Sequence, residues 1–227
     1  MSFDSGPRVR PERGWERDWE RGDMRVIVFG ATGKTGEHVW RKALEQGHEV
    51  TAFGRSVERL AVVEPSLGTF KGDVFDAAAV AEAVVGHDAA IVCIGSVSLR
   101  DKTTLSSGTK NIVDALVRQQ VQRLVVVSAA GVGESWKQAS LTARLLFKTM
   151  LRNVFADHQA QEAVVRRSSL DWTIVRAAVL NDRPATGFAA SNSTPAKRIS
   201  REDLADFLVE QLADPSNSRR AISVASR

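Results

Sequence analysis

Arg25-Val26-Ile27-Val28-Phe29-Gly30-Ala31-Thr32-Gly33-Lys34-Thr35-Gly36 is the stretch on which the fold prediction rests. Its apolar start is typical of a buried parallel strand, and the pattern over 34–46 predicts a helix directly after the turn. The three glycines are spaced three residues apart. In such a strand-turn-helix the first glycine permits a tight turn, the second lets backbone amides approach a pyrophosphate, and the third allows close packing of the helix on the strand. The stretch therefore predicts a dinucleotide-binding site, with the diphosphate at the positive end of the helix.

Gly33-Lys34-Thr35 also resembles the end of a P-loop, the phosphate-binding loop of many ATPases and kinases. That loop requires a glycine five positions before its second glycine, and Val28 occupies this position inside the predicted strand. ATPase or kinase chemistry is therefore disfavoured. A glycine pattern alone would also fit a structural turn, but the strand–helix units that follow it favour a nucleotide site.

The composition is that of a globular protein with one substantial core. The 227 residues are 43% hydrophobic and 26% charged, which is ordinary for a folded domain. The net charge is +4, but the basic side chains are scattered among carboxylates, so a nucleic-acid partner is disfavoured. No apolar stretch reaches membrane-spanning length. We predict neither a membrane partner nor a metal site.

The cysteine content bears on the cellular compartment. Cys93 is the only cysteine and lies in the apolar run 89–94, so it is expected to be a buried core residue. Because no intrachain disulfide can form, a reducing, cytoplasmic location is favoured. The N-terminus lacks the apolar core of a signal peptide.

Residues 1–23 differ from the rest of the chain, with five arginines, six acidic residues and few aliphatic ones. This composition predicts a disordered N-terminal extension. In an alternative, Trp15 and Trp19 lie four residues apart on one side of a helix and form a docking patch for a protein partner. The acidic residues argue against an organellar transit peptide.

From Met24 onward, strand-like and helix-like patterns alternate. Strands are predicted at 25–29, 49–53, 68–71, 89–95, 123–128, 172–177 and 221–225, and helices near 34–46, 76–85, 107–119, 157–168 and 201–213. This order predicts an α/β fold over 24–227, a single-domain Rossmann-like doubly wound parallel sheet with helices on both faces. Ligands of such sheets bind beyond the carboxyl ends of the strands, where the strand order reverses. The less regular segments 130–156 and 178–200 are expected to build the substrate pocket.

The end of the second strand carries the signal for the type of cofactor. Sites that prefer NAD place Asp or Glu there to bind the ribose hydroxyls. This chain instead has Arg55, nineteen residues after Gly36, with Arg59 one turn later. A guanidinium can pair with a 2′-phosphate through two parallel hydrogen bonds, whereas a carboxylate would repel it, so the pattern favours NADP(H) over NAD(H). In the alternative, both arginines only solvate a helix start, and Glu58 competes for either of them.

Further cofactor contacts are expected at the ends of the next two strands. Asp73 follows the third strand, where its side chain could meet the adenine edge. Gly95-Ser96 closes the fourth strand, where small residues would let the cofactor pass. Either feature alone would be only a turn signal.

These segments resemble the short-chain dehydrogenase/reductase superfamily, specifically its atypical, NAD(P)H-binding, NmrA-like branch and the biliverdin IXβ reductase/flavin reductase group. The matching segments are Phe29–Gly36, Arg55 with Arg59, Gly72-Asp73-Val74, Gly108–Val113, Val126–Ser128 and Asp171–Arg176. The likeness runs from about Met24 to the C-terminus. With the residues above, it implies cofactor contacts at Gly30, Thr32, Gly33, Lys34, Thr35, Gly36, Arg55, Arg59, Asp73, Val74, Ile94, Gly95, Ser96 and Ser128.

The catalytic residues differ from those usual in the superfamily, because the chain contains no tyrosine. Most short-chain dehydrogenases use a Tyr-x-x-x-Lys pair, so alcohol–carbonyl oxidoreduction by that pair is excluded. By resemblance, Ser128 lies near the nicotinamide and His158 matches a substrate-site histidine, which could donate a proton or orient an acceptor. Asp157-His158 is expected to begin the corresponding helix. In the alternative, His158 is only a polar surface residue there.

Arg176 matches the arginine of a related Val-Arg-Pro segment after the sixth strand, and it is expected to hold the fold by pairing with Asp203 or Glu202. The chain departs from its relatives at Ala177-Ala178. It departs again at Val179, where the biliverdin/flavin group can carry a pocket histidine. These departures weaken any specific tetrapyrrole assignment.

Two functions from different classes follow from these residues. The first is an NADP(H)-dependent reductase of a flavin, quinone or tetrapyrrole-like conjugated acceptor, because an isoalloxazine takes up hydride with little acid–base help from the protein. The second is a non-catalytic NADP(H)-binding sensor or regulator of NmrA-like type, which the tryptophan-bearing extension favours. A sugar-nucleotide epimerase is disfavoured by the missing tyrosine and the small C-terminal region.

Overall fold

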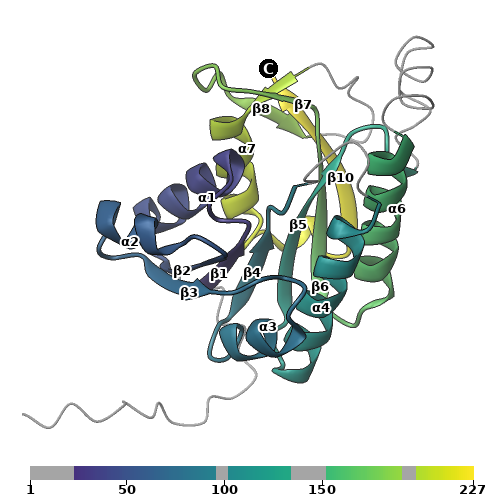
Figure 1. The fold of residues 1–227 in the computed structure, drawn as a ribbon. Coiled ribbons are helices and arrows are strands. Elements are labelled where there is room, and N and C mark those ends of the chain that lie inside the picture. The colour runs from purple at the N-terminus through teal and green to yellow at the C-terminus, as the bar shows by residue number, and fades with distance from the viewer. Residues whose placement is uncertain (1–22, 96–101, 134–151, 191–197) are drawn as a thin grey trace, which may run out of the picture.

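A computed structural model describes residues 23–95, 102–133, 152–190 and 198–227 of the chain (Figure 1). The strands are β1 (Arg25–Phe29), β2 (Glu49–Gly54), β3 (Gly68–Lys71), β4 (Ala89–Val92), β5 (Arg123–Ala129), β6 (Asp171–Ala177), β7 (Val179–Asn181), β8 (Phe188–Ala190), β9 (Arg198–Ser200) and β10 (Arg220–Ser226). The helices are α1 (Lys34–Glu45), α2 (Glu58–Val63), α3 (Ala77–Ala83), α4 (Thr104–Arg118), α6 (Arg152–Arg167) and α7 (Arg201–Glu210), with a 3₁₀ helix, η3, at Pro215–Asn217. None of the helices in these ranges is both long and apolar enough to cross a membrane.

One sheet contains eight of the strands, in the order β3-β2-β1-β4-β5-β6-β10-β8, and β7 pairs separately with β9. Neighbouring strands run parallel from β3 to β10, and the edge strand β8 is antiparallel to β10. The strand order reverses between β1 and β4, which opens a crevice at their carboxyl ends. The predicted doubly wound parallel sheet is therefore confirmed.

Helices cover both faces of the sheet, with α1, α2 and α7 on one face and α3, α4 and α6 on the other (Figure 1). Strand β1 shows how this arrangement follows from the sequence. Val26 and Val28 pack in the core that contains α1 and α7, whereas Ile27 and Phe29 pack in the core that contains α3 and α4. Because successive side chains of a strand point to opposite faces, a strand covered on both sides requires a continuous apolar run.

The C-terminal part contains short elements that the sequence pattern does not predict. Strands β7, β8 and β9 lie within the segment 178–200 and have three residues each, too few for an alternation pattern to be told from a loop. Helix α2, with six residues, is not predicted for the same reason. Residues 134–151 of the other expected pocket segment lie outside the described ranges, as do residues 1–22 of the expected extension.

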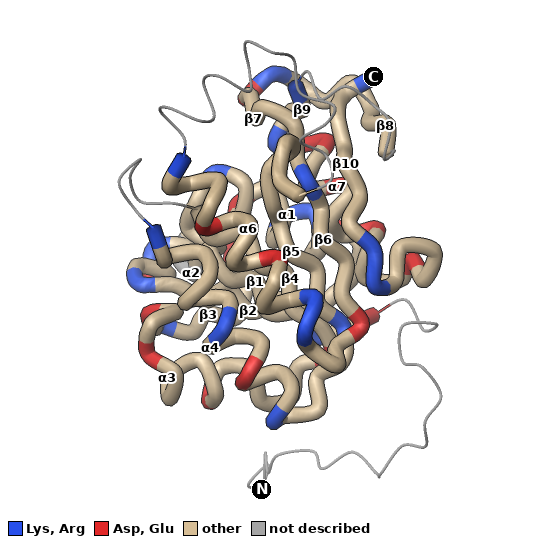
Figure 2. Tube along the Cα trace, turned by 90° about the vertical axis from the view of Figure 1, so that its right-hand side faces the viewer, with Lys and Arg blue, Asp and Glu red and all other residues tan. Residues whose placement is uncertain are grey.

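Charged residues of both signs are interspersed along the described parts of the chain (Figure 2). Many form local pairs, such as Arg41 with Glu37 at 2.9 Å and Lys110 with Asp114 at 2.5 Å, each one turn apart on a helix. Exposed pairs of this kind contribute little stability.

Three histidines have lowered pKa values, in each case chiefly because burial disfavours the charged ring. His48 Nδ1 accepts a hydrogen bond from the Met24 amide at 3.2 Å. His87 Nε2 lies 2.9 Å from Thr51 Oγ1. The third is His158, which belongs to the site described below. The folded protein therefore holds all three rings neutral at pH 7.

We expect the free energy of unfolding to fall as the pH is lowered from about 7.5 to about 5. An unfolded histidine binds its proton near pH 6.5, whereas these rings bind theirs at lower pH, so the unfolded state takes up protons first. The stability that they confer is full above about pH 6.5 and is lost as the pH falls through their folded-state pKa values. Urea unfolding at constant ionic strength measures this drop. His48→Gln should reduce this drop, and a urea midpoint that stays constant would contradict the prediction.

Candidate cofactor-binding site

The glycine-rich turn between β1 and α1 brings backbone segments so close together that a larger residue would not fit. At Gly30, φ is +81° and a Cβ atom would lie 2.7 Å from the carbonyl oxygen of Cys93, just beyond β4. At Gly36, a Cβ atom would overlap the carbonyl oxygen of Gly30. These contacts match the tight turn and the close helix packing expected of the first and third glycines.

Helix α1 begins without a side-chain cap, unlike three other helices in the described ranges. Its N-cap residue, Gly33, has no side chain that could bind the first-turn amides. Asp76 and Ser200 bind such amides in α3 and α7, and Asp157 does so in α4 by reaching across from α6. An open helix N-terminus binds phosphate through its amides and its partial positive charge. The start of α1 therefore fits the diphosphate of a dinucleotide.

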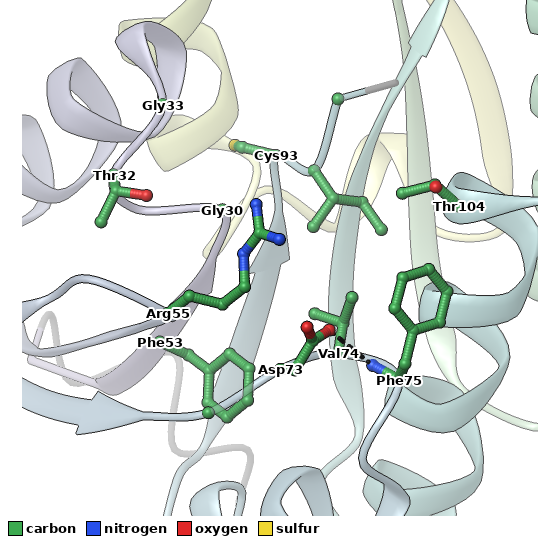
Figure 3. Close-up of a pocket in the computed structure, with 14 residues that line it drawn as sticks. Gly30, Thr32, Gly33, Phe53, Arg55, Asp73, Val74, Phe75, Cys93 and Thr104 are labelled. Carbon is green, nitrogen blue, oxygen red and sulfur yellow. Dashed lines mark hydrogen bonds between the residues drawn. The ribbon is translucent and has the colours of Figure 1, made fainter. Parts of the chain in front are cut away.

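A cavity of about 210 Å³ lies beside this turn, at the carboxyl ends of the strands that flank the reversal of strand order (Figure 3). Eight predicted residues line it: Gly30, Thr32, Gly33, Arg55, Asp73, Val74, Ile94 and Gly95. Six other residues complete the lining: Phe53, Gly54, Gly72, Phe75, Cys93 and Thr104. Most of the six adjoin a predicted residue in the sequence, which could have indicated them. Thr104 begins a helix, and no local signal connects it with the cavity.

Arg55 projects into the cavity between Gly30 and Asp73 (Figure 3). Asp73 shapes the loop after β3, because its Oδ1 accepts a hydrogen bond from the Phe75 amide at 3.0 Å. The Phe75 ring is half-exposed at the rim of the cavity. A guanidinium, a carboxylate and an aromatic ring thus surround one space, and this set of groups suits an adenosine that carries a phosphate.

Three of the other predicted cofactor residues, Lys34, Thr35 and Gly36, form the first turn of α1 beside the cavity. Lys34, Thr35, Gly36, Arg59 and Ser128 do not line the cavity, and Ser96 is outside the described ranges. Lys34 Nζ instead pairs with Asp182 Oδ2 at 2.9 Å, at the surface. Glu58 competes for neither Arg55 nor Arg59, because its Oε1 pairs with Lys71 Nζ at 2.6 Å.

Cys93 lines the cavity instead of lying wholly within the core. Burial raises the pKa of its thiol to about 12. The sulfur therefore stays protonated and is a poor nucleophile. The contribution of this residue to the site is its backbone carbonyl, which packs against Gly30.

Ser128, at the end of β5, is hydrogen-bonded to a buried ion pair. Its Oγ donates to Glu162 Oε1 at 2.9 Å. The same carboxylate accepts hydrogen bonds from Arg176 Nε at 2.9 Å and Arg176 Nη2 at 2.8 Å. The exposed fractions are 2% for Ser128 and 4% for both ion-pair residues. Because the Ser128 hydroxyl donates its hydrogen to Glu162, its oxygen can only accept a hydrogen bond from a ligand.

The predicted partners of Arg176 are wrong. The guanidinium of Arg176, on β6, pairs with the carboxylate of Glu162, on α6, where this helix packs against the sheet. Asp203 and Glu202 instead accept hydrogen bonds from backbone amides within 185–187. Those two carboxylates therefore organise the loop before β8.

The predicted start of the helix at Asp157-His158 is also wrong. Helix α6 is already formed at Arg152, so this pair lies in its second turn. Asp157 does act as a capping residue, but for α4: its carboxylate accepts from the amides of Leu105 at 2.8 Å and Ser106 at 3.0 Å. The preference of Asp for helix starts is satisfied on a neighbouring helix.

His158 is half-buried, and its Nδ1 lies 3.2 Å from Gln161 Oε1. Burial is the largest cause of its lowered pKa, and Gln161 and two nearby carboxylates oppose the shift. The ring is therefore neutral at pH 7. In that state it orients a ligand through hydrogen bonds and carries no extra proton to donate.

The fold and the site together define a dinucleotide-binding Rossmann-like protein. The sequence model of the NAD(P)H-binding family matches residues 30–215, and the chain belongs to this family. An uncharacterized chloroplastic protein of Arabidopsis thaliana is 28% identical over 238 residues, which cover 100% of this chain and 85% of the relative. The uncharacterized protein YwnB of Bacillus subtilis is 25% identical over 218 residues, which cover 89% and 99%.

Solved structures share the fold along most of the chain. The anaerobillin reductase ChuY of Escherichia coli O157:H7 has a TM-score of 0.76 and 23% identity, with 89% of this chain and 97% of that chain covered. A short-chain dehydrogenase/reductase of Veillonella parvula, solved in complex with NADP, has a TM-score of 0.73 and 21% identity, with 89% and 94% covered. The predicted membership of an NAD(P)H-binding family is confirmed, and the chain shares its fold with solved short-chain dehydrogenases/reductases.

Proposed function

We propose that the protein is an NADP(H)-dependent reductase that passes hydride to a flavin, quinone or tetrapyrrole-like conjugated acceptor in the cytoplasm. The observation that carries the proposal is a cavity beside the glycine-rich turn, with Arg55 in its lining, in a chain that has no tyrosine. Arg55 on the cavity wall supports NADP(H). Without a Tyr-Lys pair, a conjugated acceptor is the substrate that needs the least acid–base help. The anaerobillin reductase and the NADP-bound neighbour support the class of enzyme and the cofactor.

Different residues of the site would bind the two ends of the cofactor. The first amides of α1 would bind the diphosphate, and Arg55 would pair with the 2′-phosphate. Asp73 and Phe75 would hold the adenine. When bound, the cofactor would supply a hydride for the acceptor, and water would supply the proton. Near the nicotinamide, Ser128 would accept a hydrogen bond and His158 would orient the acceptor.

Incubation of the purified full chain with NADPH and a panel of flavins and quinones tests the proposal. We expect NADPH oxidation that requires both the protein and at least one acceptor. The loss of NADPH absorbance measures this oxidation. Arg55→Asp should lose this activity at low NADPH concentration. Tight NADPH binding without oxidation above background for every acceptor would overturn the reductase function.

A non-catalytic NADP(H)-binding sensor is the second candidate function. One observation favours it: Ser128 is nearly inaccessible and donates its proton to Glu162, so its hydroxyl is not a donor for a substrate. Such a sensor would report the cofactor state to a protein partner, with Trp15 and Trp19 of the extension as its contact. Binding without oxidation in the same panel supports this function.

A further inference from the structure

A chain of hydrogen bonds that begins on α4 holds His158 in place. Gln161 Nε2 donates to Thr109 Oγ1 at 3.0 Å, and Gln161 Oε1 lies 3.2 Å from His158 Nδ1. Thr109 and Gln161 are both 0% exposed. The chain therefore crosses the packed interface between α4 and α6 without access to water, and each of its members has a fixed partner.

The direction of this chain determines the tautomer of the ring. Because the amide nitrogen of Gln161 faces Thr109, the amide oxygen faces His158 and can only accept. Nδ1 must then carry the hydrogen and donate it. A neutral imidazole has one N–H, so Nε2 is left with a lone pair. Burial favours this neutral form by lowering the pKa of the ring.

His158 lies where the nicotinamide half of the cofactor site is expected. Helix α6 runs antiparallel to β5, because it joins β5 to the parallel strand β6. His158 is one helical turn before Glu162, the partner of Ser128, and is therefore closer to the carboxyl edge of the sheet. Its partner helix α4 begins with Thr104, which lines the cofactor cavity on the side away from Arg55 (Figure 3).

The geometry points to Gln161 and Thr109 as positioning residues that fix His158 as the Nδ1–H tautomer, so that Nε2 accepts a hydrogen bond from an N–H or O–H group of the acceptor. This inference rests on the proposed reductase function and narrows its substrate class. A flavin, which has a ring N–H, satisfies the Nε2 lone pair. A quinone that has only carbonyl oxygens presents lone pairs to it and is disfavoured.

Nitrogen NMR of the full chain with ¹⁵N-labelled histidine tests the tautomer without any substrate. The chain has four histidines, and His158→Gln identifies the signal of interest. We expect a protonated Nδ1 and an unprotonated Nε2 at pH 7. In Gln161→Leu, which removes the acceptor, the hydrogen should move to Nε2. A wild-type ring with its hydrogen on Nε2 would mean that the Gln161 amide has the reverse orientation, and it would overturn the inference.

Steady-state kinetics with flavin mononucleotide and with menadione, a quinone without N–H or O–H groups, test the substrate class. In Gln161→Leu we expect KM for the flavin to rise about tenfold, the loss of roughly one hydrogen bond. We expect KM for menadione to fall, because Nε2–H can donate a hydrogen bond to a quinone carbonyl, while kcat for the flavin and the NADPH affinity stay near their wild-type values. Thr109→Val should behave like Gln161→Leu, and Thr109→Ser, which keeps the hydroxyl acceptor, should restore the flavin KM.

An equal rise in KM for both acceptors would overturn the selection of N–H or O–H groups. A loss of NADPH binding in Gln161→Leu would show a structural role and would also overturn it. If the wild-type protein oxidises NADPH with neither acceptor, the selection of flavin over quinone is overturned, whereas the reductase function is overturned only if every acceptor of the panel fails. The NMR spectrum separately decides the tautomer.

Discussion

Arg55→Asp is expected to weaken NADPH binding about 100-fold and NADH binding less than about threefold. The guanidinium projects into the cavity between Gly30 and Asp73, where it is placed to form two charge-assisted hydrogen bonds with a 2′-phosphate (Figure 3). A hydrogen bond to a charged group contributes roughly 1.5–3 kcal/mol, and about 1.4 kcal/mol is a factor of ten. NADH has no 2′-phosphate, so it loses neither bond.

Arg59→Asp is the matched control, because it makes the same change of charge nearby. Arg59 is exposed on α2 and does not line the cavity, so we expect only a small, salt-dependent loss of NADPH affinity. Titration of each variant with both cofactors at two ionic strengths measures these effects. Equal losses for NADPH and NADH in Arg55→Asp would show that Arg55 does not meet the 2′-phosphate. Equal losses of NADPH affinity in the two variants would show that the overall positive charge near the site affects binding, and not a specific contact of Arg55.

The fold and much of the lining of the candidate cavity could be predicted because their signals are local. Gly30 and Gly36 meet within one strand-turn-helix, so their spacing alone indicates the close approach. Arg55 follows a strand at the distance where a ribose phosphate is expected. The continuous apolar run of β1 indicates a strand that is covered on both faces, so it predicts a parallel sheet with helices on both sides.

The contacts around Ser128 and His158 could not be predicted in the same way, because they join segments that are distant in the chain. Asp157 of α6 caps α4 by binding the amide of Leu105, which is 52 residues earlier in the chain. No local sequence pattern distinguishes this role from the capping of its own helix. Gln161 likewise binds Thr109 from 52 residues away. Arg176 had several carboxylates in reach on sequence grounds, and only the packing of α6 against the sheet selects Glu162.

Glu162→Ala is expected to lower the free energy of unfolding by about 3–5 kcal/mol, the usual effect of removing one partner of a buried ion pair. The carboxylate accepts two hydrogen bonds from Arg176, one from Ser128 and a longer one from Arg166 at 3.4 Å, and Glu162, Arg176 and Ser128 are almost inaccessible to water. Its removal leaves a buried guanidinium without this carboxylate, and water cannot replace the lost bonds without opening the core. Urea unfolding at pH 7 measures the loss.

Two further variants separate the buried pair from the general effect of removing a carboxylate. Glu37→Ala breaks an exposed pair with Arg41 on α1 and should cost at most about 0.5 kcal/mol. The double variant Glu162→Leu with Arg176→Leu removes both charges and fills the space with apolar groups, so it should be more stable than Glu162→Ala. If Glu162→Ala costs no more than Glu37→Ala, the cluster around Ser128 is not a rigid support. The hydroxyl of Ser128 would then be free to turn toward a ligand as a donor, and the case for a non-catalytic sensor would lose the observation that favours it.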